Sequence, residues 1–255
     1  METMEFHRKA FNSVGWFIPP YVQMGFLGQL AKQIEDKRLN DGNLELILGQ
    51  LYSADYLSSM ICERYPIVPC INDYKEIIAE TIESHFLGLD HVAVAGLMPV
   101  IEGAGRKLAE SRSVTVSSIK SVFQNLAADC KNDVIANNIG AVGEIISMMD
   151  SFIDFTDNNL YINANSYGFD DKTNRHGILH GAYSDEDYGT PINFYKSIAA
   201  VDFLCFVSAL RAPISCFAPK PTEHSLMLGN YYQICKQVSN IKPKATNKSL
   251  ENRRA

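Results

Sequence analysis

The residues of this chain that could do chemistry are concentrated in the segment Asn174–Gly181, which reads NRHGILHG. It holds an asparagine, an arginine and two histidines, His176 and His180. Histidine titrates near neutral pH and can donate or accept a proton. Arginine stays charged and can bind two phosphate oxygens with parallel hydrogen bonds. These groups suit cleavage of a phosphodiester, and in RNA the 2′-hydroxyl can supply the nucleophile, so the chemistry needs no metal ion.

The spacing of the segment decides how these groups could meet. In a helix, His176 and His180 are four residues apart and share a face. Arg175 and His180 would point about 140° from each other. A long arginine at the first turn could still curve toward His180, or the same segment of a second subunit could supply the partner. Gly177 and Gly181 weaken a helix, which predicts a short or broken turn.

We assign Arg175 as the phosphate clamp and His180 as the proton-transfer residue. Asn174 and His176 would orient or bind the substrate, and no metal or other cofactor is predicted. Two other interpretations stay open. Arg175 and His180 could cap helices and bond backbone carbonyl groups. His176 and His180 could be metal ligands at positions i and i+4, although the glutamate of a zinc-protease motif does not follow His176.

The run from Arg175 to His180 resembles the R-x4-6-H signature of HEPN domains (higher eukaryotes and prokaryotes nucleotide-binding), with a polar residue directly after the arginine. The wider pattern NRHGILHG…DYGT…N…K…DF, from Asn174 to Phe203, looks like a version found in uncharacterised bacterial proteins of that superfamily. A fainter likeness lies around Glu102, where related chains often carry an acidic residue. Glu102 would then hold Arg175 or a histidine in place; by itself it could equally be a surface or capping carboxylate.

The resemblance implies an all-α, dimeric protein in which two copies of the motif meet in one cleft. Many HEPN proteins are metal-independent endoribonucleases of toxin, antiphage or RNA-processing systems. The resemblance therefore implies RNA as substrate, a homodimer, and an antitoxin or defence-complex partner. Other members lack nuclease activity, so the competing interpretation is a non-catalytic helical interaction module of a multi-protein defence complex.

Composition limits the remaining function classes. The 255 residues are 46% hydrophobic and 20% charged, as in ordinary globular proteins. The net charge of −6 argues against a chain coated in positive charge for duplex binding, so RNA would need a local basic patch. The six cysteines form no C-x-x-C pair, which favours a reducing cytoplasm. We predict no membrane span, because no uncharged apolar run reaches about 18 residues.

Hydrophobic periodicity predicts the elements that must position the motif. Helices are expected at about 21–38, 44–64, 71–87, 90–110, 117–131, 140–156, 190–210 and 224–239. Thr190-Pro191 is a strong helix start. The helix that follows is apolar nearly all round, so it should be the most buried element and support the motif.

Three further expectations concern local structure. Pro99 is expected to kink or split the helix 90–110. The polar loop 157–172 could contain a short strand at 160–162. His85 lies on the apolar face of its helix and is predicted to be packing.

We therefore predict one helical domain over residues 1–240, an all-α, multi-helix HEPN-like bundle with additional N-terminal helices. Residues 1–88 could form a subdomain, and the HEPN-like part spans about 89–240. Residues 241–255 carry five basic residues and almost nothing apolar, which predicts a disordered basic tail.

Overall fold

The computed structural model describes residues 4–37 and 41–241, and this part of the chain is helical, with no strand. The all-α fold class predicted from the sequence is confirmed. The predicted tail, apart from Ile241, lies outside the described residues. The α-helices are α1 (Met4–Asn12), α2 (Met24–Glu35), α3 (Asp41–Leu51), α4 (Ala54–Ser59), α5 (Lys75–Phe86), α6 (Asp90–Ser111), α7 (Ile119–Asn137), α8 (Val142–Phe155), α9 (Arg175–Leu179), α10 (Pro191–Ala209) and α11 (Glu223–Ile241). Shorter turns are the π-helical η1 (Met60–Arg64) and η3 (Thr156–Leu160) and the 3-10 turns η2 (Asn72–Tyr74) and η4 (Ala164–Ser166).

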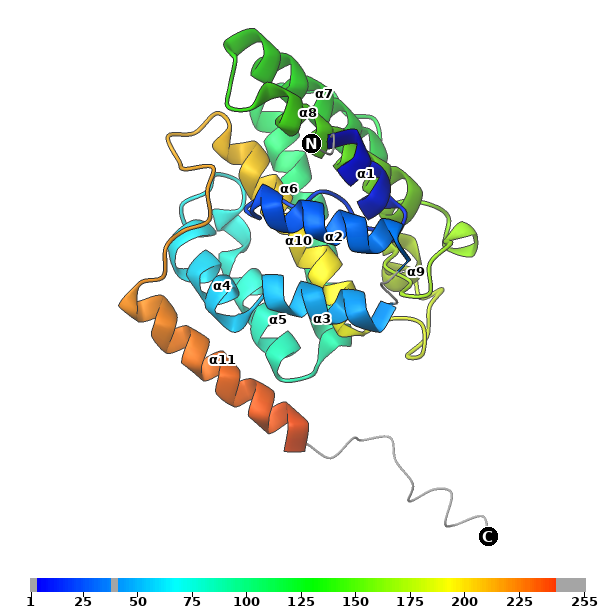
Figure 1. Ribbon diagram of the computed structural model, residues 1–255, viewed down its shortest axis with the longest axis vertical. Coiled ribbons are helices and arrows are strands. Elements are labelled where there is room, and N and C mark those ends of the chain that lie inside the picture. The colour runs from blue at the N-terminus through cyan, green and yellow to red at the C-terminus, as the bar shows by residue number, and fades with distance from the viewer. Residues whose placement is uncertain (1–3, 38–40, 242–255) are drawn as a thin grey trace.

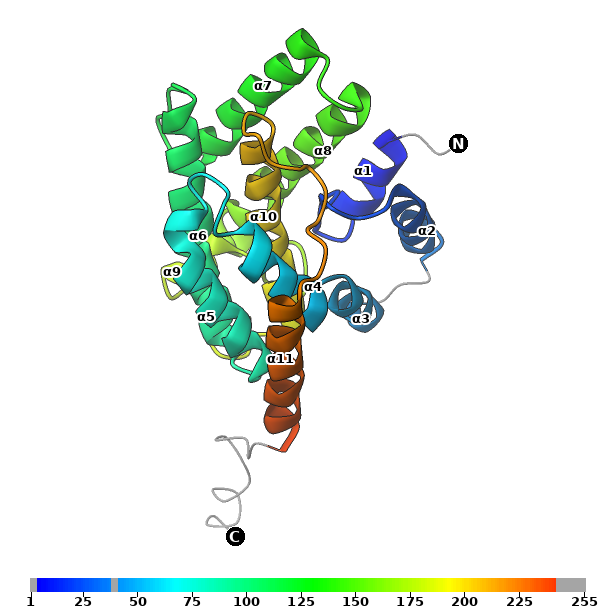
Figure 2. The same ribbon diagram turned by 90° about the vertical axis from the view of Figure 1, so that its left-hand side faces the viewer.

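Helix α10 runs through the middle of the molecule, with α6 and α3 packed against it (Figures 1 and 2). Every residue from Ile192 to Ala209 is buried, as its apolar surface predicted. Pro191 occupies the first turn, and Asn193 Oδ1 accepts hydrogen bonds from the backbone N–H and the hydroxyl of Thr190 (3.0 and 2.7 Å). Among the described helices, α10 alone is long and apolar enough to cross a membrane, and it is wholly enclosed by this chain.

Residues 4–20 share their core with the centre of the chain. The segment Trp16–Ile18 is fully buried. The ring of Phe17 lies 5.0 Å from that of Phe152 on α8 and 5.9 Å from that of Phe203 on α10. Helix α1 packs on α8, and α11 lies along α4 and α5 at the opposite edge (Figure 1). The N-terminal helices are therefore built into the same core as α8 and α10.

Helix α1 was not predicted, α5 begins later than expected, at Lys75, and α7 runs on to Asn137; two other differences have a local cause. The helix expected from residue 21 begins at Met24, because Tyr21 has a φ of 65° and lies in a turn. The helix expected to run unbroken to Arg64 is interrupted after Leu51. Ser53 starts α4 by accepting a hydrogen bond from the backbone N–H of Tyr56 (3.3 Å). This cap begins a new helix, although the apolar residues keep helical spacing across the break.

Two further expectations concern Pro99 and residues 160–162. Pro99 does not split its helix: α6 runs from Asp90 to Ser111 with the proline inside. No strand forms at residues 160–162, because η3 extends α8 as a π-helical turn through Leu160 and closes with a hydrogen bond from the Tyr161 N–H to the Thr156 carbonyl (2.9 Å).

Asp202 is a carboxyl group buried in the middle of α10. It is 1% exposed and accepts hydrogen bonds from the hydroxyls of Tyr56 (2.7 Å) and Tyr65 (2.8 Å). Burial raises its pKa to about 7, although these hydrogen bonds and the charge of Arg64 oppose the shift. Asp202 is thus a site where folding and protonation are coupled.

We expect Asp202→Asn to be more stable than the wild type at pH 7.5, and the advantage to vanish near pH 4. The unfolded chain ionises Asp202 near its ordinary pKa of 3.8, whereas the folded chain holds the proton up to about 7. The stability that this group contributes is full below pH 4 and is lost as pH rises to 7, by roughly 4 kcal/mol at most. Urea unfolding of both proteins at pH 4.5, 6 and 7.5 measures the difference. A difference that does not change with pH would contradict this expectation.

Candidate functional site

Asn174 fixes the start of α9, which lies against α6. Its side chain is fully buried, and Oδ1 accepts a hydrogen bond from the backbone N–H of Gly177 (2.8 Å). Nδ2 donates to the carbonyl oxygens of Asn159 (2.8 Å) and Ile162 (2.9 Å). Asn174 therefore caps the helix and ties it to the preceding loop. Of the two roles expected for Asn174, its burial is compatible with orienting the site and not with direct contact to a substrate.

A buried network connects the segment before α9 to α10. Lys196 is fully buried and pairs with Asp171, whose carboxylate also accepts hydrogen bonds from the Tyr167 hydroxyl (2.6 Å) and the Thr173 N–H (2.8 Å). Asn193 donates to Thr173 Oγ1 (2.9 Å). Burial alone would raise the pKa of Asp171, but the Lys196 charge and these hydrogen bonds hold it below its ordinary value. Asn193 and Lys196, which follow the motif in the sequence, therefore hold the motif in place.

Arg175 and His180 meet because α9 is short. The helix ends at Leu179, and His180 lies beyond it with a φ of −98° and a ψ of 5°. Arg175 Nη1 lies 2.7 Å from His180 Nε2. A guanidinium has only donors, so Nε2 accepts this hydrogen bond, which makes the ring the tautomer with its proton on Nδ1.

Glu102 on α6 holds the guanidinium from another side. Arg175 Nη2 donates to Glu102 Oε2 (3.3 Å), and Arg175 Nε pairs with Oε1. The Arg175 and Glu102 side chains are 17% and 15% exposed, whereas His180 is exposed. The structure thus brings Glu102, Arg175 and His180 together within one chain, with the imidazole open to solvent.

His176 lies beside this cluster as a second imidazole. Its ring stacks on that of His180, with centroids 5.6 Å apart and planes at 16°, and it meets the edge of Tyr161 at 6.4 Å. Partial burial and the neighbouring Arg175 charge lower the pKa of His176 below 6.5, against the opposing charge of Glu102. His176 therefore favours the neutral form at neutral pH. Residues 4–37 and 41–241 contain no group of three or more His, Cys, Asp or Glu side chains placed to hold a metal ion.

Two residues beside the cluster were not assigned from the sequence. Tyr161 has a buried hydroxyl without a hydrogen-bond partner in the described part of the chain, and burial followed by the Glu102 charge raises its pKa well above the ordinary value. Arg106 is exposed one turn after Glu102, and its charge acts on the same hydroxyl as that of Arg175. The only sequence signal for Arg106 was its i+4 spacing from Glu102 on one helix.

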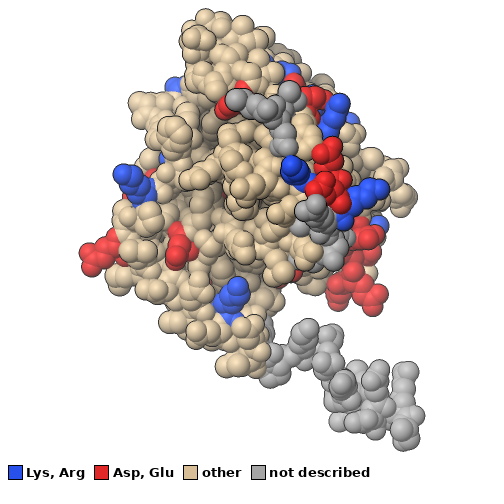
Figure 3. All heavy atoms as spheres, in the orientation of Figure 1, with Lys and Arg blue, Asp and Glu red and all other residues tan. Residues whose placement is uncertain are grey.

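The surface charge agrees with the overall composition. On the face shown in Figure 3, the charged side chains lie mostly along one edge, where both signs alternate, and the broad middle carries few. This face therefore presents no continuous basic surface of the kind that duplex binding requires.

Comparisons of the chain with protein-family models, curated proteins and solved structures find no match. A function must therefore be argued from the motif and from the geometry of the cluster that Arg175, His180 and Glu102 form.

Proposed function

We propose that this chain is a HEPN-like, metal-independent endoribonuclease that acts as a cytoplasmic homodimer, as a component of a toxin or antiphage-defence system. The observation that carries the proposal is the contact between the Arg175 guanidinium and the exposed His180 imidazole, 2.7 Å apart and held by Glu102. The defence role and an antitoxin or complex partner rest on the resemblance of residues 174–203 alone.

The cluster suits a transesterification of RNA in which the 2′-hydroxyl is the nucleophile and the protein supplies the acid, the base and the positive charge. The 2′-oxygen attacks the adjacent phosphorus, its bond to phosphorus forms, and the bond from phosphorus to the 5′-oxygen breaks. The products are a 2′,3′-cyclic phosphate and a 5′-hydroxyl. A base must take the 2′-hydroxyl proton, an acid must protonate the 5′-oxygen, and a cation must neutralise the phosphate.

Each requirement has a candidate group. His180 Nε2 carries the one lone pair of the ring and can accept the proton once the Arg175 donor turns from it to the phosphate, where Arg175 can bind the non-bridging oxygens. A second imidazole must then act as the acid; His176 of the same chain favours the neutral form, so we assign this role to His180 of a second copy at a symmetric cleft. Arg106 adds an exposed positive charge next to this surface. The homodimer is therefore part of the proposed mechanism and not only of the family likeness.

The alternative function is a non-catalytic helical interaction module of a defence complex. The observation that favours it is the pairing of Arg175 with Glu102, which neutralises the guanidinium and leaves its side chain 17% exposed. A phosphate must compete with Glu102 for this arginine. The module predicts no RNA cleavage by the wild type at any protein concentration.

The test incubates purified wild type with mixed RNA in EDTA, beside Arg175→Ala and His180→Ala purified in the same way. The proposal predicts cleavage by the wild type alone. Equal cleavage by all three proteins would indicate a contaminating nuclease, and no cleavage by any would favour the interaction module.

We expect Glu102→Gln to lower the cleavage rate by about tenfold without raising the KM. Glutamine keeps the shape and one oxygen acceptor but loses the charge, so Arg175 is less firmly placed while its attraction for phosphate is no weaker. Initial rates over a range of RNA concentrations separate kcat from KM. Glu110→Gln, an exposed substitution on the same helix, is the matched control. A KM that rises with kcat unchanged would show that Glu102 binds substrate and does not position Arg175.

A further inference from the structure

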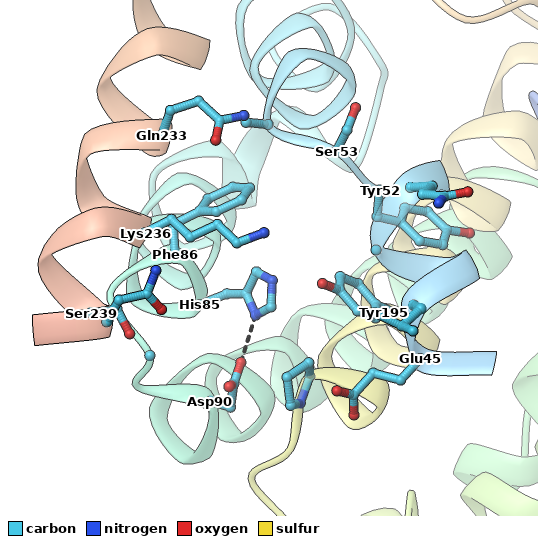
Figure 4. Close-up of a pocket in the computed structure, with 17 residues that line it drawn as sticks. Glu45, Tyr52, Ser53, His85, Phe86, Asp90, Tyr195, Gln233, Lys236 and Ser239 are labelled. Atoms are coloured by element: carbon cyan, nitrogen blue, oxygen red, sulfur yellow. Dashed lines mark hydrogen bonds and ion pairs between the residues drawn. The ribbon is translucent and has the colours of Figure 1, made fainter. Parts of the chain in front are cut away.

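A second site lies at the start of α6, away from Arg175. A cavity of about 470 Å³ opens between α3, the end of α5, the start of α10 and α11 (Figure 4). Small-molecule sites span about 300–1,000 Å³. Asp90 lines the cavity, and Glu102 lies twelve residues further along the same helix, about 18 Å at a rise of 1.5 Å per residue. The cavity is therefore separate from the Arg175 cluster.

His85 is fixed on the wall of this cavity. Its Nδ1 lies 2.6 Å from Asp90 Oδ1, and its ring stacks on Phe194 with centroids 3.9 Å apart and planes at 8°. The ring thus packs as the sequence predicted, but it also has a defined orientation. Since Nδ1 is bound to the carboxylate, Nε2 remains as the open ring nitrogen, and it has no hydrogen-bond partner among the described residues. Figure 4 shows the ring between Asp90 and the open part of the cavity.

Two opposite charges face the cavity from either side of His85. Lys236 extends from α11, and Glu45 lies on the other side, on α3 (Figure 4). Neither forms an ion pair with another described residue. Partial burial raises the pKa of Glu45, although a hydrogen bond from the Ile192 backbone N–H opposes the shift; the charge of Asp90 adds to it and that of His85 opposes it. The Glu45 carboxylate has no ion-pair partner among the described residues, and a bound ammonium group would supply one.

The space between these charges has an aromatic wall. Phe86, Tyr52 and Tyr195 line it, and the two tyrosine rings stack with centroids 6.1 Å apart. Gln233 and Ser239 lie on α11 near Lys236 and add polar groups on that side (Figure 4). A ligand that matches the site carries an anionic group, a cationic group and an apolar body.

We propose that this cavity binds a small zwitterionic amino compound, an α-amino acid or a short peptide. The ligand carboxylate contacts Lys236. The ligand ammonium donates to Glu45 and to Nε2 of His85, which Asp90 holds in the accepting tautomer. The side chain lies against the aromatic wall. This site is independent of the proposed nuclease cluster.

The experiment is calorimetric titration of the wild type with L-phenylalanine, 3-phenylpropionate, phenethylamine and the dipeptide Phe-Ala, after a thermal-shift screen of the standard amino acids. We expect phenylalanine to bind about tenfold more tightly than the analogue that lacks its amine and the one that lacks its carboxylate. Glu45→Gln should remove the preference over phenylpropionate, and Lys236→Met the preference over phenethylamine. Glu35→Gln and Lys32→Met, both at exposed positions on α2, should change neither.

Each outcome decides the proposal. Tighter binding of the dipeptide than of phenylalanine would identify a peptide site, and the reverse a free amino acid site. Absence of binding by every standard amino acid and by Phe-Ala at about 10 mM would overturn the proposal. So would binding that the Glu45 and Lys236 variants leave unchanged, because it would lie elsewhere on the protein.

Discussion

Lys196→Ala is expected to lower the free energy of unfolding by about 3–5 kcal/mol. The substitution leaves the carboxylate of Asp171 buried without its cation, and it also removes the hydrogen bond that Lys196 donates to the carbonyl oxygen of Val14 (2.9 Å). Urea unfolding followed by circular dichroism measures the loss. Because Asp171 also holds the Thr173 N–H just before the motif, we expect amide exchange in residues 171–180 to become faster.

Two companion proteins separate the buried charge from other causes. The double variant Asp171→Asn with Lys196→Met removes both charges of this buried pair, and the asparagine keeps an oxygen for Thr173, so it should lose less stability than Lys196→Ala alone. Lys120→Ala breaks a surface ion pair with Asp157 (3.5 Å) and should cost less than about 1 kcal/mol. If Lys196→Ala proved as mild as Lys120→Ala, the network before α9 would not hold the motif.

His180→Ala is expected to lower the single-turnover rate of RNA cleavage by about 10²–10⁴-fold, the usual contribution of a general acid or base. The fold should be unaffected, because the His180 side chain is exposed and Arg175 is its one hydrogen-bond partner among the described residues. His176→Ala should have a smaller effect, since this ring stacks on His180 and touches neither Arg175 nor Glu102 by a hydrogen bond. Rates measured with labelled RNA and excess enzyme, at equal unfolding midpoints, give the comparison.

Arg175→Lys tests the role of the guanidinium in the contact between Arg175 and His180. Lysine keeps the charge but loses the planar fork that can bind His180, Glu102 and a phosphate together, so the rate should stay far below the wild type. A lysine variant with wild-type activity would show that only the charge matters. A His176→Ala loss larger than that of His180→Ala would move the proton-transfer role to His176.

The sequence predicted the helices whose signals are local and unopposed. Helix α10 was expected because Thr190-Pro191 starts a helix and the following residues are apolar on every side. Helix α3 was expected to continue, because apolar residues keep helical spacing past its end. Two features depend on backbone geometry that composition does not reveal. They are the helix cap at Ser53 and the left-handed backbone conformation of Tyr21.

The part of the candidate site that depends on residues close in sequence was predicted, and the part that depends on long-range packing was not. Arg175 and His180 are close in sequence, so their meeting needed only a short turn, which the glycines indicated. Glu102 came from a likeness and not from spacing, because 73 positions separate it from Arg175. The pairing of Lys196 with Asp171 and the burial of Tyr161 depend on how α10 and the loop before α9 pack, and no local pattern records that.

The central claim is that a guanidinium and an imidazole of this chain act on a phosphodiester whose own 2′-hydroxyl is the nucleophile. The most direct measurement uses a DNA oligonucleotide with a single ribonucleotide, incubated with wild type in EDTA, followed by mass spectrometry of the new ends. We predict one cut on the 3′ side of the ribonucleotide, with a 2′,3′-cyclic phosphate and a 5′-hydroxyl. New ends with a 3′-hydroxyl and a 5′-phosphate, or an uncut substrate at high enzyme concentration, would contradict the account.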